Sequence, residues 1–199
     1  MTSPSAVSGR YDRFAIALHW LLAVAVLAQI GLGWYASDIP RGTPARGWFI
    51  NLHKSVGITL GVLLVVRLVW RLRSGAPAWP ATMSRLQVLA ARSAHAALYA
   101  CMLLLPLAGY LASNFSKHGI KYFHTVLLSP WGPDLPRVYA FFTGLHVALS
   151  WVLVSLIALH VAAALLHLAR RDGVFARMLP PTAPRAQPQA TPVLATDTK

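Results

Sequence analysis

Residues 138–168 read VYAFFTGLHVALSWVLVSLIALHVAAALLHL, an apolar run without Asp, Glu, Lys or Arg. The run is long enough to cross the roughly 30 Å hydrocarbon layer of a bilayer as one helix. It contains two interior histidines, His146 and His160. At about 100° and 1.5 Å per residue, they project within about 40° of each other and lie about 21 Å apart along the axis. The segment therefore predicts one helix with two imidazoles on one face, one near each side of a membrane.

The composition of the whole chain is that of a membrane protein. Of its 199 residues, 56% are hydrophobic and only 12% are charged. Residues 14–35, 48–70 and 86–111 are further apolar segments of spanning length. We therefore expect an all-α membrane protein built as a four-transmembrane-helix bundle, in which Pro106 kinks the third span or loosens its outer end. The predicted domain covers residues 10–178, and residues 1–9 and 180–199 are predicted to be disordered tails.

The charge balance is strongly basic, with 18 Lys and Arg against 5 acidic residues and a formal net charge of +13. Because the basic residues flank apolar spans, they indicate orientation in a membrane with anionic lipid and no nucleic-acid partner. One side of a four-span bundle receives most of the arginines, which predicts that both termini are cytoplasmic. That side carries Arg10, Arg13, Arg71, Arg73, Arg85, Arg170, Arg171, Arg177 and Arg185, and the other side carries Arg41, Arg46, Lys54, Lys117, Lys121 and Arg137.

Four histidines fall at paired depths in this arrangement. His19 and His160 lie near the cytoplasmic side, and His53 and His146 lie near the outer side. A lone histidine in a span is more often a core residue than a ligand, but four at paired depths favour metal binding. We expect two haem irons, an inner one held by His19 and His160 and an outer one held by His53 and His146. The chain has no C-x-x-C-H motif, so both would be non-covalent haem b.

Several other residues have two possible roles. His95 could replace His19 or His160 as a ligand, or make a polar contact near the interface. His167 is expected at the interface, and His118 and His124 are expected in solvent. Three arginines and two glycines near the expected haems also have two possible roles. Arg13, Arg67 and Arg71 could neutralise the propionates of the inner haem or anchor the membrane interface, and Gly57 and Gly61 could admit a macrocycle or only pack helices.

Four fragments of the sequence resemble the bacterial cytochrome b561 family. They are RYDRFAIALHW at 10–20, NLHKSVG at 51–57, the pair LHVA at 145–148 and LHVAAA at 159–164, and RDGVFARMLP at 171–180. The resemblance covers about residues 10–180. It implies a multi-pass, di-haem protein of the bacterial inner membrane that exchanges electrons with a quinone, with ubiquinone as the expected partner. The ligand positions of the family fall on His19, His53, His146 and His160.

Three functions are compatible with these features. The first is a respiratory-chain cytochrome that carries electrons between the quinone pool and a periplasmic redox protein. The second is a superoxide oxidase, a superoxide:ubiquinone oxidoreductase, in which Lys117 and Lys121 of the outer loop steer the anion. The third is a haem-carrying membrane anchor of a larger dehydrogenase, as the related formate dehydrogenase and hydrogenase cytochrome subunits are. A long stoichiometric interface would distinguish the anchor.

Overall fold

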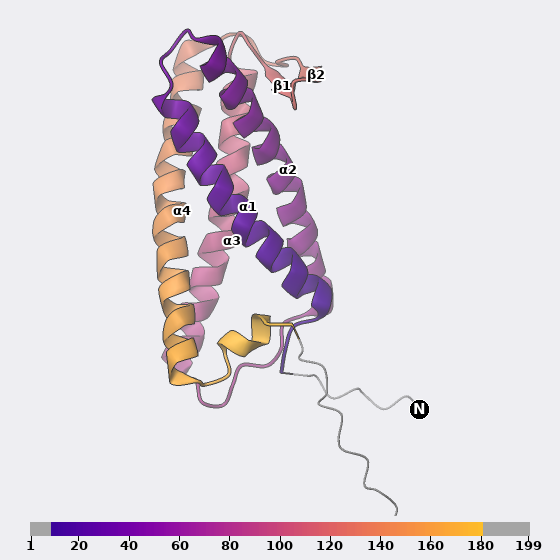
Figure 1. Ribbon diagram of the computed structural model, residues 1–199, viewed down its shortest axis with the longest axis vertical. Helices are drawn as coiled ribbons and strands as arrows, with labels where there is room; N and C mark the ends of the chain where they lie inside the picture. The colour runs from indigo at the N-terminus through magenta and orange to yellow at the C-terminus, as the bar shows by residue number, and fades with distance from the viewer. Residues whose placement is uncertain (1–8, 181–199) are drawn as a thin grey trace, which may run out of the picture.

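A computed structural model of the chain describes residues 9–180. Four long helices form one elongated bundle (Figure 1). They are α1 Arg13–Asp38, α2 Pro44–Ser74, α3 Arg85–Asn114 and α4 Pro136–Arg170. All four are long and apolar enough to cross a membrane, which confirms the predicted four-helix architecture. The predicted tails, with Arg185, lie outside the described residues except for Gly9 and Pro180.

Local sequence explains where these helices begin. Asp12 caps α1 by accepting a hydrogen bond from Ala15 N at 2.9 Å. Thr43 caps α2, with Pro44 at the first helical position, where a missing N–H costs nothing. Ser84 and Gln87 form a reciprocal capping box at the start of α3. The caps satisfy backbone donors that neither the helix nor an apolar surrounding could satisfy.

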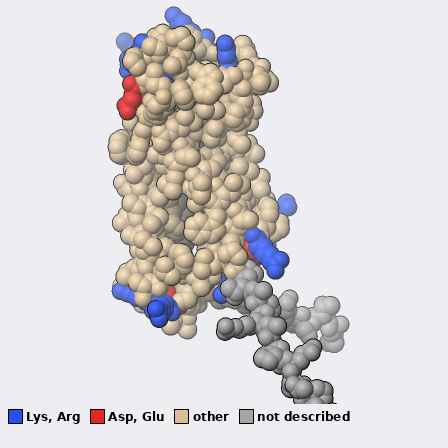
Figure 2. Space-filling model, in the orientation of Figure 1, with Lys and Arg blue, Asp and Glu red and all other residues tan. Residues whose placement is uncertain are grey.

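The core of the bundle is small and its outer surface is apolar. α3 packs on α4, α1 packs on α2, and α2 packs on α3. The buried cluster consists of Leu18 and Leu22 from α1 and Leu60 and Leu64 from α2. Many large apolar side chains elsewhere are exposed. In Figure 2 an uncharged belt separates Lys and Arg side chains gathered toward the two ends. This distribution suits a bundle surrounded by lipid.

The two ends of the bundle differ. At the first, which we call the tail end, α1 and α3 begin, α2 and α4 end, and the short helix η1 Phe175–Met178 folds back (Figure 1). At the second, the hairpin end, strands β1 Ile120–Tyr122 and β2 Val126–Leu128 pair antiparallel. The sequence did not predict this hairpin, because three-residue strands leave almost no periodic signal. The hairpin is a small addition to the predicted all-α fold.

Arg177 of η1 fastens three separate chain segments together at the tail end. Its side chain is 8% exposed. Its guanidinium donates to the carbonyl oxygens of Gly9 at 3.0 Å, Pro77 at 2.8 Å and Ala78 at 2.9 Å. It also lies 5.8 Å from the ring centroids of Tyr11 and Trp79. The sequence analysis counted Arg177 only as an orienting charge, and the structure gives it a structural role as well.

We predict that Arg177→Met destabilises the protein by at least about 1.5–3 kcal/mol, the value of one hydrogen bond to a charged group. The methionine keeps much of the packing but leaves three carbonyl oxygens without their donor. Titration of the detergent-solubilised protein with SDS measures the loss in the free energy of unfolding. Arg170→Met is the matched control, because Arg170 ends α4 on the exposed surface of the same end. Equal stability of both variants would show that the three segments do not depend on Arg177.

Candidate functional site

Two of the predicted histidines face each other near the hairpin end. His53 of α2 and His146 of α4 have ring centroids 6.0 Å apart and ring planes inclined by 82°. His146 Nδ1 lies 2.9 Å from the carbonyl oxygen of Leu105. Because a carbonyl oxygen can only accept, Nδ1 carries the proton and Nε2 keeps its lone pair. That is the tautomer of a metal-binding imidazole whose second nitrogen is held by the protein.

Each of these two rings lies against a glycine of a neighbouring helix. A Cβ on Gly33 of α1 would come within 2.8 Å of His53 Cε1, and a Cβ on Gly109 of α3 would come within 3.0 Å of His146 Nδ1. Any larger residue would displace the rings or separate the helices. Neither glycine could be predicted from the sequence, because the rotation of α1 and α3 about their axes decides which residue meets the ring.

Gln29 of α1 holds the backbone beside His53. Its Nε2 donates to the His53 carbonyl oxygen at 2.7 Å, although that carbonyl lies within a helix. Gln29 Oε1 and His53 Nδ1 are both buried and have no hydrogen-bond partner among the described residues. Buried polar atoms without partners are uncommon, and they concentrate where a ligand completes a site. A Cβ on Gly57 would come within 3.1 Å of Gln29 Nε2, whereas a Cβ on Gly61 would make an ordinary contact with Pro106 at 3.6 Å.

Three histidines meet nearer the tail end. His19 of α1 and His160 of α4, the predicted pair, have ring centroids 6.3 Å apart and planes inclined by 76°. His95 of α3 also faces His160, at 5.5 Å and 68°. The Nδ1 atom of His95 is buried without a partner in the described part of the chain. The structure therefore brings the predicted pair together and adds the rival residue to the same cluster.

His167 points elsewhere, toward Asp172. The hydrogen bond from His167 is the main cause that holds the pKa of the Asp172 carboxyl below its ordinary value. This contact joins the last turn of α4 to a residue just beyond its end. His118 and His124 are exposed in the loop at the hairpin end, and His124 stacks on Trp48 with ring centroids 4.7 Å apart.

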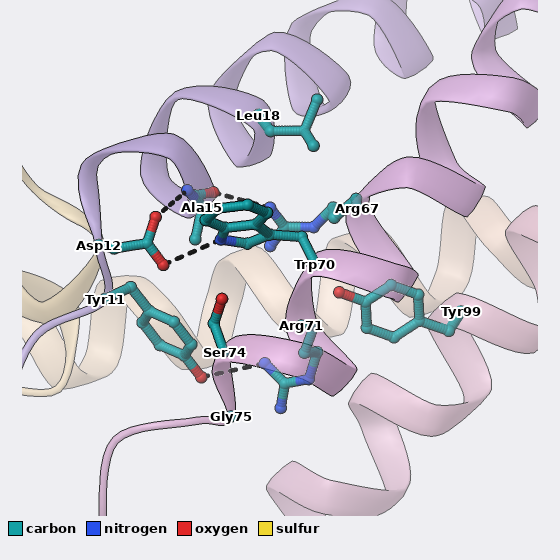
Figure 3. Close-up of a pocket in the computed structure, with 10 residues that line it drawn as sticks. All are labelled: Tyr11, Asp12, Ala15, Leu18, Arg67, Trp70, Arg71, Ser74, Gly75 and Tyr99. Carbon is teal, nitrogen blue, oxygen red and sulfur yellow. Dashed lines mark hydrogen bonds between the residues drawn. The ribbon is translucent and has the colours of Figure 1, made fainter.

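A polar pocket adjoins the histidine cluster at the tail end (Figure 3). Arg67 donates to the Ala15 carbonyl oxygen at 2.8 Å and lies 3.2 Å from His19 Nδ1. One turn further along α2, Arg71 donates to Tyr11 Oη at 3.1 Å. These two of the predicted arginines therefore line the pocket, whereas Arg13 is exposed and does not line it.

Asp12 is the acidic residue of this pocket, and its carboxylate carries the local negative charge. Partial burial raises its pKa, but hydrogen bonds from Ala15 N and the Trp70 indole outweigh that effect and hold the pKa below its ordinary value. The carboxylate therefore stays ionised and caps α1 at neutral pH. The Arg67 guanidinium thus lies beside His19, the Arg71 guanidinium beside Tyr11, and the Asp12 carboxylate beside the Trp70 indole.

The histidines near the two ends of the bundle limit which metal-containing group could bind there. Among residues 9–180, no three His, Cys, Asp or Glu side chains are placed to hold a metal ion together. What the bundle offers is pairs of imidazoles, and a haem iron leaves two axial positions for the protein. The unpartnered nitrogen of His53 and the glycines beside the His53 and His146 rings suit such a group. At the other pair, Arg67 can only donate to His19 Nδ1, so binding of a metal through His19 Nε2 would require this contact to change.

Comparison with known proteins gives the same result. The family described as prokaryotic cytochrome b561 matches residues 10–181. The protein called cytochrome b561 homolog 2 of Escherichia coli (strain K12) is 33% identical over 174 residues, which cover 85% of this chain and 91% of that protein. The protein called probable superoxide oxidase CybB of Yersinia pestis is 27% identical over 180 residues, which cover 86% of this chain and 96% of that protein.

The bundle with paired imidazoles defines a membrane haem protein, and the chain belongs to the prokaryotic cytochrome b561 family. Membership implies b-type haem, as the missing C-x-x-C-H motif indicated.

We predict that Gly33→Ala and Gly109→Ala each weaken the binding of haem at the His53–His146 pair. The new Cβ would displace the ring of His53 or His146. Changes to residues that orient a metal ligand typically lower the affinity for the metal by about 10–100-fold. Haem content and redox titration measure the effect. Gly31→Ala on α1 and Gly144→Ala on α4 are matched controls, because a Cβ there meets nothing within 4 Å. If the control and test variants bind and titrate alike, the glycines do not position the outer rings.

Proposed function

We propose that this protein is a di-haem b-type cytochrome that moves electrons across the bacterial inner membrane. In this proposal the quinone pool, represented by ubiquinone, exchanges electrons with a periplasmic redox partner through the protein. The observation that carries the proposal is the pair of facing imidazoles at each of two levels of the bundle, with ring centroids 6.0 Å and 6.3 Å apart.

These separations agree with two rings that point their nitrogens at one iron. A metal–imidazole nitrogen bond of about 2.0–2.1 Å, with the ring centroid about 1.1 Å beyond the nitrogen, gives a centroid separation of about 6.3 Å. The His53–His146 and His19–His160 pairs both fall close to that value. His95 and His160 are 5.5 Å apart, which is too short without a movement of about 0.8 Å. The separation therefore favours His19 over His95 as the partner of His160.

The residues of the chain then have defined roles. His53 and His146 would hold the outer haem, and His19 and His160 the inner haem. When bound, haem would supply a one-electron redox centre, and two histidines of the chain would hold it at each site. Outer-sphere electron transfer fits such a site. Arg67 and Arg71 lie where they could neutralise inner propionates, because both line the pocket beside His19.

Orientation follows from the charges at the two ends. The tail end carries more arginines than the hairpin end has basic residues, and cytoplasmic loops are enriched in Lys and Arg. Both described chain ends lie at the tail end (Figure 1). We therefore place the tail end in the cytoplasm and the hairpin end in the periplasm.

Single replacement of the four histidines tests the ligand assignment. We predict that His53→Ala and His146→Ala each remove the same redox component, and that His19→Ala and His160→Ala each remove the other. A redox titration of each purified variant should show one surviving component. His95→Ala is the control and should retain both components. Loss of a haem in His95→Ala but not in His19→Ala would overturn the inner assignment.

A second function, superoxide oxidase, is favoured by the Yersinia pestis relative, whose name refers to that activity. The exposed lysines at the hairpin end could steer an anion toward the outer site. Lys117 lies 3.6 Å from Asp134, so its charge is partly neutralised. Lys121 is exposed, and its side chain has no ion-pair partner in the described part of the chain. Lys121 should therefore contribute more to steering than Lys117.

We predict for this activity that superoxide reduces the purified protein rapidly and that ubiquinone reoxidises it. Lys121→Gln should slow reduction more than Lys117→Gln. The double variant should lose rate toward the lower end of the roughly 10–10³-fold range that charged clefts provide. The loss should be largest at low salt, because salt screens exposed charges over about 8–10 Å.

Arg170→Gln with Arg171→Gln, at the tail end, is the control and should leave the rate of reduction unchanged. A wild-type rate that is indifferent to salt and to the lysines would exclude steering and favour the electron carrier.

A further inference from the structure

A polar stripe on α2 fastens the hairpin to the side of the bundle. Its members recur every four residues, so they lie on one face of the helix. Its hydrogen bonds join Asn51 Oδ1 to Lys121 N at 2.9 Å, Ser55 Oγ to Phe123 N at 2.8 Å and Thr59 Oγ1 to Tyr122 Oη at 2.9 Å. Ser55 is fully buried. Lys54 adds a hydrogen bond to the carbonyl oxygen of Gly119 at 3.1 Å. β1 is therefore held firmly against α2.

The stripe also fixes the depth of the hairpin. Residues 51 and 59 are separated by about 12 Å of helix rise. Both belong to α2, one of the four candidate membrane spans. Figure 1 shows the hairpin projecting sideways beside α2, near the end of the bundle and not above it. The hairpin therefore lies beside the first half of α2, within the length of that candidate span.

The exposed side of the hairpin is apolar. In β2 all three residues are exposed and hydrophobic: Val126 at 54%, Leu127 at 58% and Leu128 at 37%. Trp131 follows at 63%. Lys121 pairs with Leu127 across the hairpin, so the long basic side chain lies on the same face as the more exposed of the two leucines in β2. In water such an exposed apolar edge strand would promote aggregation, so another apolar surface or lipid is expected to cover it.

We propose that lipid covers it, and that the hairpin is an interfacial anchor in the leaflet at the hairpin end. Its apolar edge continues the lipid-facing surface of α2, where Val62 is 60% exposed. Trp131 and Trp48 suit the membrane interface, where indoles concentrate. Lys121 can keep its ammonium in interfacial water while its stem covers part of Leu127, its cross-strand partner. The unpaired backbone edge of β2 keeps access to interfacial water, which the hydrocarbon core would deny.

Cysteine accessibility in proteoliposomes tests the anchor. The single native cysteine, Cys101, is buried and is replaced by alanine to give the background. Leu127→Cys is then labelled with a membrane-impermeant maleimide in phosphatidylcholine–phosphatidylglycerol vesicles that contain the haem-loaded protein. Lys117→Cys, on the same loop with its side chain 75% exposed, sets the rate for a thiol in water. Leu159→Cys, 68% exposed on α4, sets the rate for a thiol in lipid.

We expect the thiol at position 127 to react roughly tenfold or more slowly than the thiol at position 117, because the reactive thiolate is disfavoured in an apolar surrounding. The protection should be the same at low and high protein density in the vesicles. Reaction as fast as at position 117 would place the hairpin in water, free for a soluble partner, and would overturn the anchor. Protection that is lost at low protein density would assign the apolar edge to a second copy of the chain.

Discussion

A polar side chain inside an apolar span must find its partner within the protein, because hydrocarbon offers none. This constraint organises the bundle. Gln29 donates to a backbone carbonyl of another helix, Ser55 accepts from the hairpin, and Arg67 donates to α1. The buried nitrogen and oxygen atoms that remain unpartnered among residues 9–180 belong to His53, His95 and Gln29. Of these three atoms, one belongs to the proposed ligand His53, one to Gln29 on α1, whose side chain donates to the His53 carbonyl oxygen, and one to His95, whose ring faces His160.

The same constraint explains why the helices approach so closely at the outer pair. Gly33 and Gly109 let two helices meet the edges of the His53 and His146 rings. A ring held on its edge by backbone has little freedom to rotate, so it is oriented before any ligand arrives. Preorganisation of this kind keeps a redox centre similar in its oxidised and reduced forms, as fast outer-sphere electron transfer requires. At the tail end, His160 instead faces both His19 and His95, so the geometry offers two possible partners for His160.

Much of the architecture could be predicted from the sequence. Hydropathy located the four spans, because each is a long apolar run bounded by caps or charges. The depth of the histidines predicted which ones would meet. Gly33, Gly109 and Gln29 could not be assigned, since their roles depend on the rotation of each helix about its axis. The hairpin was missed because its strands have three residues each, although the four-residue spacing of Asn51, Ser55 and Thr59 was a visible signal of a polar partner.

Electron paramagnetic resonance of the fully oxidised, haem-loaded protein tests the central claim most directly. The imidazole planes of the two predicted pairs are inclined by 76° and 82°. Two bis-histidine haems with nearly perpendicular axial rings should give two highly anisotropic low-spin ferric signals, each lost when one of its own histidines is replaced. A high-spin signal or a single low-spin species would contradict the proposal that these pairs hold two six-coordinate haems. Two rhombic low-spin signals, typical of parallel rings, would contradict the ring inclinations alone.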